Sequence, residues 1–86
     1  VIECVPGPLA ARITAELQVP TIGIGAGGST DGQILVFHDL CGVGAGPFPR
    51  FVRRYLDGEC LFMNALNAYA ADVTARQFPN NEESYA

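Results

Sequence analysis

The carboxylate best placed for chemistry is Glu3, which lies in the apolar run of residues 1–5 just before the Pro-Gly-Pro of residues 6–8. The run predicts a short buried strand, and parallel α/β sheets form their sites at the carboxyl ends of strands. A carboxylate among Val, Ile and Cys side chains loses solvation, which favours its protonated form and suits it to acid or base work. Glu3 is therefore a candidate general base or acid. The alternative is a Glu at a strand edge that faces water or pairs with Arg12.

The second candidate is the glycine-rich run from Gly23 to Gly28, which fits the G-x-G-x-x-G pattern of dinucleotide-binding loops. That pattern requires a helix directly after the last glycine, whereas the Ser-Thr-Asp-Gly of residues 29–32 indicates a turn. Glycines at a strand end also allow bare backbone to approach a ligand or a neighbouring strand closely. Close approach is the favoured interpretation, and a module that holds a nucleotide or phosphate stays open as the alternative.

The other polar candidates favour structural roles. His38 and Asp39 are neighbours on a predicted strand, so their side chains point to opposite faces and cannot share one metal ion. Arg50, Arg53 and Arg54 form a basic cluster at the start of the C-terminal helical region. Cations at a helix N-terminus oppose the helix dipole, so an anion or an acidic partner would stabilise them there. A solvated face is the simpler interpretation of this cluster.

Composition indicates one small globular domain. Of the 86 residues, 49% are hydrophobic and 16% are charged, which favours a packed chain over a disordered one. The net charge of -4 repels phosphate backbones and anionic lipids, so nucleic acid and membrane surfaces are not expected as partners. The sequence contains no Lys, which excludes a Schiff-base lysine and the Walker lysine of a P-loop. No apolar run approaches the ~20 residues of a membrane span. Three widely spaced thiols are expected to be reduced, small apolar fillers of a cytoplasmic protein: Cys4, Cys41 and Cys60.

Hydrophobic periodicity predicts the elements that position these residues. Leu9, Ile13 and Leu17 recur every four residues and predict a helix over 9–17, with Gly7 as N-cap and Pro at the first helical position. A strand at residues 21–26 follows. Strand, helix and strand form a βαβ unit, so we expect two parallel strands with a right-handed crossover.

The chain after this unit is less determined. Residues 33–39 form a third apolar run, separated from the second strand by only a few residues. A parallel crossover normally needs about a dozen residues, so the link indicates a hairpin, a crossover without its helix, or a helix at residues 31–40. Apolar positions at helical spacing predict C-terminal helices over 50–78, as a helix pair or one kinked helix. We expect a partial domain over residues 1–86, whose missing elements precede Val1 or come from another chain.

Three motifs in this order and spacing resemble the ketopantoate hydroxymethyltransferase family. They are Val-Ile-Glu-Cys-Val-Pro at residues 1–6, Pro-Thr-Ile-Gly-Ile-Gly-Ala-Gly at 20–27, and Asp-Gly-Gln-Ile-Leu-Val-Phe-His-Asp at 31–39. The similarity continues through residues 49–55 and into Phe78-Pro79, so it covers nearly the whole chain. It implies the C-terminal part, about strands six to eight plus terminal helices, of a (β/α)8 barrel of the phosphoenolpyruvate/pyruvate type.

The resemblance implies a transferase that moves a hydroxymethyl group from 5,10-methylenetetrahydrofolate to 3-methyl-2-oxobutanoate. The product is 2-dehydropantoate, for pantothenate and coenzyme A biosynthesis. Glu3 matches the family's proton acceptor, and a base of this kind removes a proton next to a ketone. The family cofactor is magnesium, whose ligands are expected in the N-terminal part of the barrel, so the 86 residues alone are predicted to be inactive. The full-length enzyme is expected to be a homo-oligomer.

Two segments depart from the family pattern. The Glu-Glu-Ser-Tyr of residues 82–85 lacks the family's histidine, and residues 57–64 are more apolar than the charged helix usual there. Both departures concern the C-terminal helices and subunit contacts and leave Glu3 untouched. A piece whose apolar C-terminal helices pair with other subunits is therefore a further alternative.

Overall fold

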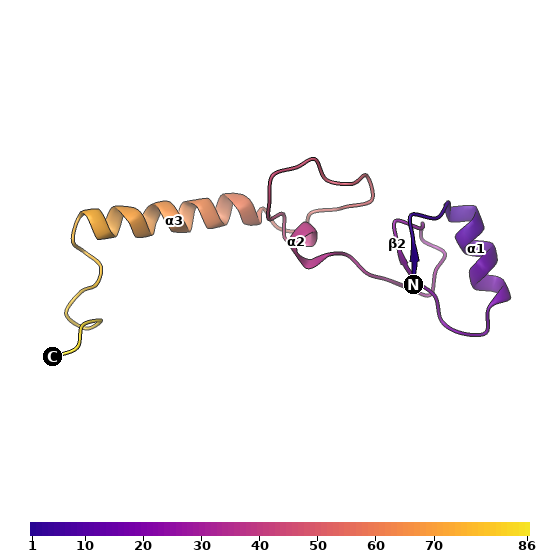
Figure 1. Ribbon diagram of the computed structural model, residues 1–86, viewed down its shortest axis with the longest axis horizontal. Coiled ribbons are helices and arrows are strands. Elements are labelled where there is room, and N and C mark those ends of the chain that lie inside the picture. The colour runs from indigo at the N-terminus through magenta and orange to yellow at the C-terminus, as the bar shows by residue number, and fades with distance from the viewer.

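The computed structural model describes all 86 residues. Its elements in chain order are β1 (Ile2–Glu3), α1 (Gly7–Glu16), β2 (Ile22–Ile24), β3 (Gly32–Gln33), α2 (Phe37–Leu40) and α3 (Gly58–Thr74). The molecule is elongated, with principal extents of 66 × 29 × 13 Å. The sheet and α1 form one end, while α3 and the C-terminal tail extend away from them (Figure 1).

The three strands form one parallel sheet in the order β1-β2-β3. Ile2 pairs with Gly23 and Glu3 pairs with Ile24, and the amide of Cys4 then donates to the Ile24 carbonyl at 2.9 Å. The predicted parallel βαβ unit is therefore confirmed, although each strand is shorter than predicted. β2 is the central strand, and β1 and β3 are the two edges.

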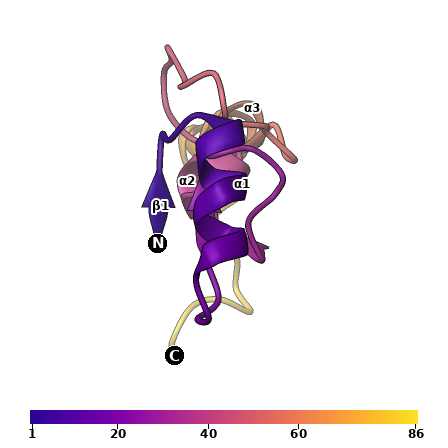
Figure 2. The same cartoon turned by 90° about the vertical axis from the view of Figure 1, so that its right-hand side faces the viewer.

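Helix α1 lies beside the sheet (Figures 1 and 2) and confirms the predicted helix to within two residues. Pro6, rather than Gly7, occupies the N-cap position, and Pro8 lies in the first turn. Proline fits there because its missing N–H would have no partner in a first helical turn. The helix ends at Glu16, and the backbone of the next residue, Leu17, is extended.

The short link from β2 to β3 is a parallel crossover without a helix, which was one of the three open alternatives. Asp31 makes it possible. Its Oδ2 accepts hydrogen bonds from the Thr21 amide at 2.8 Å and from the Thr21 hydroxyl at 3.2 Å. Thr21 is only 3% exposed, and its hydroxyl also lies 2.8 Å from that of Thr14 on α1. These contacts connect α1, β2 and β3 at the amino edge of the sheet.

The strand predicted over residues 33–39 is wrong beyond Gln33. The last ladder bond of this segment runs from the Ile34 amide to the Gly23 carbonyl at 3.0 Å. With no further ladder partner, the chain leaves the sheet and forms the single turn of α2, where the Leu40 amide donates to the Val36 carbonyl at 2.9 Å. His38 and Asp39 therefore lie on a helix and not on a strand.

The C-terminal helices predicted over 50–78 are one helix, α3, and the prediction is wrong for residues 50–57 and 75–78. In the first of these segments the Tyr55 amide donates to the Leu40 carbonyl at 2.7 Å. Directly after the segment, the amide of Gly58, the first residue of α3, donates to the Cys41 carbonyl at 2.8 Å. These long-range bonds hold the segment against α2 and take the place of helical bonds.

Few side chains are buried within this chain. Only 6 of 86 residues are buried, and the apolar ones among them are the small residues Ala10 and Ala26. The three cysteines are unpaired, and Cys4 and Cys60 are exposed, so the prediction of buried apolar fillers is wrong for these two. Helix α3 is apolar and exposed along its length at Leu61, Phe62, Met63, Leu66, Tyr69 and Val73. None of the helices combines the length and the apolar character that crossing a bilayer requires.

Candidate functional site

The candidate site is the carboxyl edge of the sheet. Glu3, Ile24 and Gln33 are the last residues of β1, β2 and β3. Because the three strands are parallel, these ends lie at the same edge, which is where open α/β sheets bind ligands. The glycine run follows β2, so it lies at the same edge of the sheet as Glu3.

The side chain of Glu3 is exposed. The expectation of a poorly hydrated carboxylate is therefore wrong for these 86 residues, and the alternative of a Glu that faces water describes it. The physical reason is that β1 is an edge strand, paired only with β2, and no other element of the chain covers its free side. Its carboxylate is accessible at the end of the strand.

The glycine run allows close packing of backbone. Gly25 has a φ of +65°, and a Cβ built there would lie 2.7 Å from Cδ1 of Phe51. Gly27 has a φ of +79°, and its Cβ would lie 3.0 Å from the Cα of Gly7. The glycines therefore allow close approach, but by the Phe51 ring and the start of α1 rather than by a neighbouring strand. No helix follows Gly28, since the next element is β3, so the run lacks the context of a dinucleotide loop.

A hollow of about 700 Å³ opens at this edge. Arg50 is the one charged residue that lines it. The other lining residues come from the end of β1, the start of α1 and the glycine run, together with an aromatic ring from the segment after Pro49: Cys4, Val5, Pro6, Gly7, Gly25, Gly27 and Phe51.

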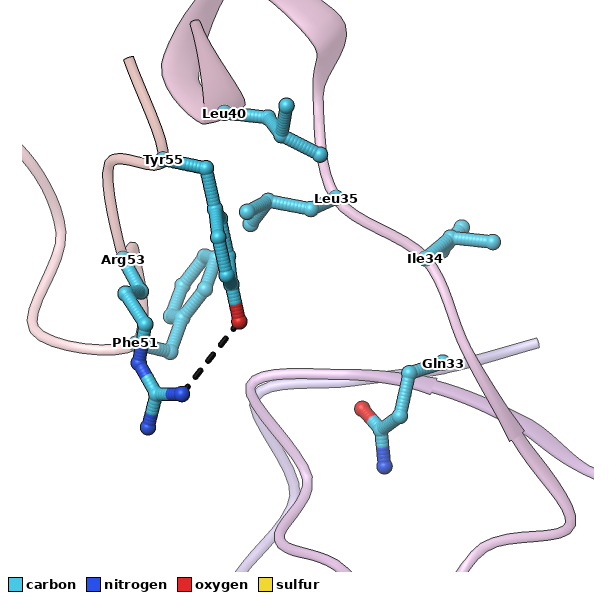
Figure 3. A pocket seen from close by; sticks show the side chains of 7 residues that line it. All are labelled: Gln33, Ile34, Leu35, Leu40, Phe51, Arg53 and Tyr55. Carbon is cyan, nitrogen blue, oxygen red and sulfur yellow. Dashed lines mark hydrogen bonds between the residues drawn. The ribbon is translucent and has the colours of Figure 1, made fainter. Parts of the chain in front are cut away.

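A second hollow of about 510 Å³ lies beside the end of β3 (Figure 3). We call it the Gln33 cleft; its lining residues are Gln33, Ile34, Leu35, Leu40, Phe51, Arg53 and Tyr55. Phe51 lines both hollows, so its ring is the wall between them. Sequence analysis did not single out Gln33 or Tyr55. For Gln33, the signal that could have identified it is the position of a polar Gln directly before an apolar run.

The predicted basic cluster does not exist as one surface at a helix N-terminus. Arg50 lines the first hollow, whereas Arg53 donates to the Tyr55 hydroxyl at 3.2 Å. Arg54 lies over the Phe48 ring, 4.9 Å from its centroid. The cluster is divided because residues 50–57 are not helical and their side chains contact different neighbours.

The chain gathers no three His, Cys, Asp or Glu side chains that could hold a metal ion. His38 instead lies edge-on to Phe37, with ring centroids 6.1 Å apart. The residues present therefore do not fit a magnesium site.

Comparison with known proteins decides the family. The model of ketopantoate hydroxymethyltransferase matches residues 1–81. The chain belongs to this family. Three similar curated relatives all carry the name 3-methyl-2-oxobutanoate hydroxymethyltransferase. The relative from Francisella tularensis subsp. tularensis is 48% identical over 85 residues, that from Bdellovibrio bacteriovorus 51% over 86, and that from Salinibacter ruber 52% over 85.

These alignments cover 99% or 100% of the chain but only 32% or 33% of the relatives. The chain thus spans about a third of the length of the curated relatives that it matches. The predicted family is confirmed, and the nucleotide-binding alternative is not favoured.

Proposed function

We propose that the chain forms part of a ketopantoate hydroxymethyltransferase. The enzyme transfers a hydroxymethyl group from 5,10-methylenetetrahydrofolate to 3-methyl-2-oxobutanoate and yields 2-dehydropantoate. The proposal is supported by 48% to 52% identity with relatives of that name. The parallel order of β1, β2 and β3 is compatible with about strands six to eight of a (β/α)8 barrel, which is the architecture we propose for the whole enzyme.

The observation that carries the proposal is the position of Glu3 at the carboxyl edge of the sheet, beside the glycine run. We assign Glu3 as the base that takes the proton from the carbon next to the keto group. An accessible carboxylate can reach a substrate, as a general base must. A bound keto acid would then exclude water from the carboxylate, and this desolvation favours the protonated form that the reaction creates.

The proposed magnesium ion would bind carboxylates outside these 86 residues, because no suitable cluster lies within them. When bound, such an ion supplies positive charge for the enolate oxygens. The proposed homo-oligomer is a property of the longer protein. The exposed apolar side of α3 is compatible with further protein surface packing there, whether from the same subunit or another.

The test uses a completed enzyme, in which the 86 residues replace the matching third of the Bdellovibrio bacteriovorus relative. Proton removal is measured separately from transfer by following deuterium incorporation from D₂O into 3-methyl-2-oxobutanoate by NMR. Glu3→Gln is expected to slow exchange by about 100-fold or more, the usual contribution of a general base.

Glu16→Gln is the matched control, because Glu16 is also exposed but lies at the far end of α1. Its exchange rate is expected to equal that of the unmodified completed enzyme. Undiminished exchange in Glu3→Gln would rule out the assigned base. An unmodified completed enzyme that makes no 2-dehydropantoate would contradict the proposed transferase itself.

A further inference from the structure

The side chain of Gln33 is held in one orientation at the end of β3. Its Nε2 donates to the Gly27 carbonyl at 2.8 Å and to the Thr30 hydroxyl at 2.9 Å. An amide nitrogen has only two hydrogens, so both are used. The amide oxygen is left as a fixed acceptor, and Figure 3 shows it on the side of the Gln33 cleft that faces Phe51.

The Gln33 cleft is lined mostly by apolar and aromatic side chains, and Arg53 is its one charged residue. The rings of Phe51 and Tyr55 come from the segment between α2 and α3, and Leu35 points toward them (Figure 3). The Tyr55 ring is restrained, since its hydroxyl accepts a hydrogen bond from Arg53 at 3.2 Å. Within these 86 residues Tyr55 is nevertheless 65% exposed, so no residue of this chain covers the open side of its ring.

A flat heterocycle with N–H groups fits this combination. Aromatic rings pack against flat ring faces, and an amide oxygen accepts from ring N–H groups. The pyrimidinone ring of a reduced folate has such donors on one edge. An aliphatic keto acid has neither a flat ring nor an N–H donor, so the cleft does not match the other proposed substrate.

The cleft also lies at the right separation from Glu3. The ends of β1 and β3 are two strand spacings apart, about 10 Å. That length corresponds to a two-ring molecule lying across the carboxyl edge. A keto acid beside Glu3 and a pterin beside Gln33 would therefore meet near the end of β2, with the Phe51 ring between the two hollows.

We propose that the Gln33 cleft binds the pterin of 5,10-methylenetetrahydrofolate, with Gln33 Oε1 accepting from its ring N–H groups and Tyr55 packing on its face. This inference rests on the proposed function. Gln33 and Tyr55 are binding residues for the folate, while Glu3 acts on the keto acid. Changes at the cleft should thus affect the folate and leave the keto acid untouched.

The test measures two variants of the completed enzyme. Gln33→Leu keeps the side-chain volume but removes the acceptor together with the two bonds that the amide donates to Gly27 and Thr30. Tyr55→Ala removes the ring and leaves the Gln33 amide in place. Each is expected to raise the KM for 5,10-methylenetetrahydrofolate about tenfold, the usual effect of one lost polar or aromatic contact. The KM for 3-methyl-2-oxobutanoate and the deuterium exchange rate should stay within twofold. Gln77→Leu, at an exposed residue after α3, is the control.

Equilibrium dialysis with tetrahydrofolate tests binding independently of turnover. Weaker binding in both variants, with unchanged circular dichroism, supports the inference even where transfer is slow. Folate KM and dialysis constants within twofold of the unmodified protein would overturn it, as would a fall in kcat for both substrates without a folate-specific change in KM. If the completed enzyme is inactive but still binds tetrahydrofolate through these residues, the proposed transferase is contradicted and folate binding at the Gln33 cleft is supported.

Discussion

Replacement of Gly25 by alanine is expected to displace Phe51 from the carboxyl edge of the sheet. Gly25 has a φ of +65°, where an L-residue with a Cβ is strained. The new methyl group would also lie 2.7 Å from Cδ1 and 3.0 Å from Cγ of the Phe51 ring, well inside ordinary contact distance. The substitution therefore combines backbone strain with a steric clash.

The two effects can be given magnitudes. A non-glycine residue in the left-handed region costs about 1–2 kcal/mol, and insertion of a methyl group into an occupied site costs about 1–3 kcal/mol. Phe51 is only half-buried, so its ring can turn outward and the second cost lies at its lower end. We expect a total of about 2–3 kcal/mol, which corresponds to at least a 30-fold shift in a local opening equilibrium.

Gly28→Ala is the matched control from the same glycine run. A Cβ at Gly28 would meet nothing within 4 Å, and its φ lies outside the left-handed region. Alanine there is expected to be neutral or to stabilise by about 0.4–1 kcal/mol, because it restricts the unfolded chain. A nucleotide-binding loop would not make this distinction, since both glycines belong to its pattern.

Hydrogen exchange in the completed enzyme is the assay. The amide of Cys4, which donates to the Ile24 carbonyl at 2.9 Å, reports opening of the sheet beside Gly25. In Gly25→Ala we expect this amide to exchange about 30-fold faster, and in Gly28→Ala at the unmodified rate. Equal exchange rates in the two variants would refute the packing argument.

Three further expectations concern the rest of the chain. Asp31→Ala should lower the free energy of unfolding of the completed enzyme by about 1.5–3 kcal/mol, because the amide of buried Thr21 loses its acceptor. Urea unfolding checks this against exposed Asp72→Ala, and equal midpoints would contradict it. The isolated 86 residues should transfer no hydroxymethyl group when both substrates and magnesium are supplied. A turnover equal to that of the completed enzyme would contradict this expectation. The isolated chain should also bind the dye ANS through α3, and Leu61→Gln with Leu66→Gln should reduce the fluorescence, whereas unchanged fluorescence would count against α3 as the binding surface.

Local sequence determined the N-terminal unit and the family. The apolar spacing of Leu9, Ile13 and Leu17 and the prolines before them predicted α1 closely, because both signals act within one or two helical turns. The parallel pairing of β1 and β2 was also predictable, because two strands joined through a helix in a short βαβ unit run in the same direction. The motifs at residues 1–6, 20–27 and 31–39 predicted the family, and the family match over residues 1–81 confirms it.

Tertiary structure decided the parts that depend on distant partners. Asp31 closes a helix-free crossover through Thr21, ten residues away, and local spacing could not choose this over a hairpin. The apolar period of residues 50–57 predicted a helix, yet the amide of Tyr55 bonds to the Leu40 carbonyl of α2. The exposure of Glu3 and the orientation of Gln33 likewise follow from which strand is an edge and which backbone groups are near. Periodicity reports neighbours three or four residues apart, whereas these features depend on contacts formed only when separate segments meet in space.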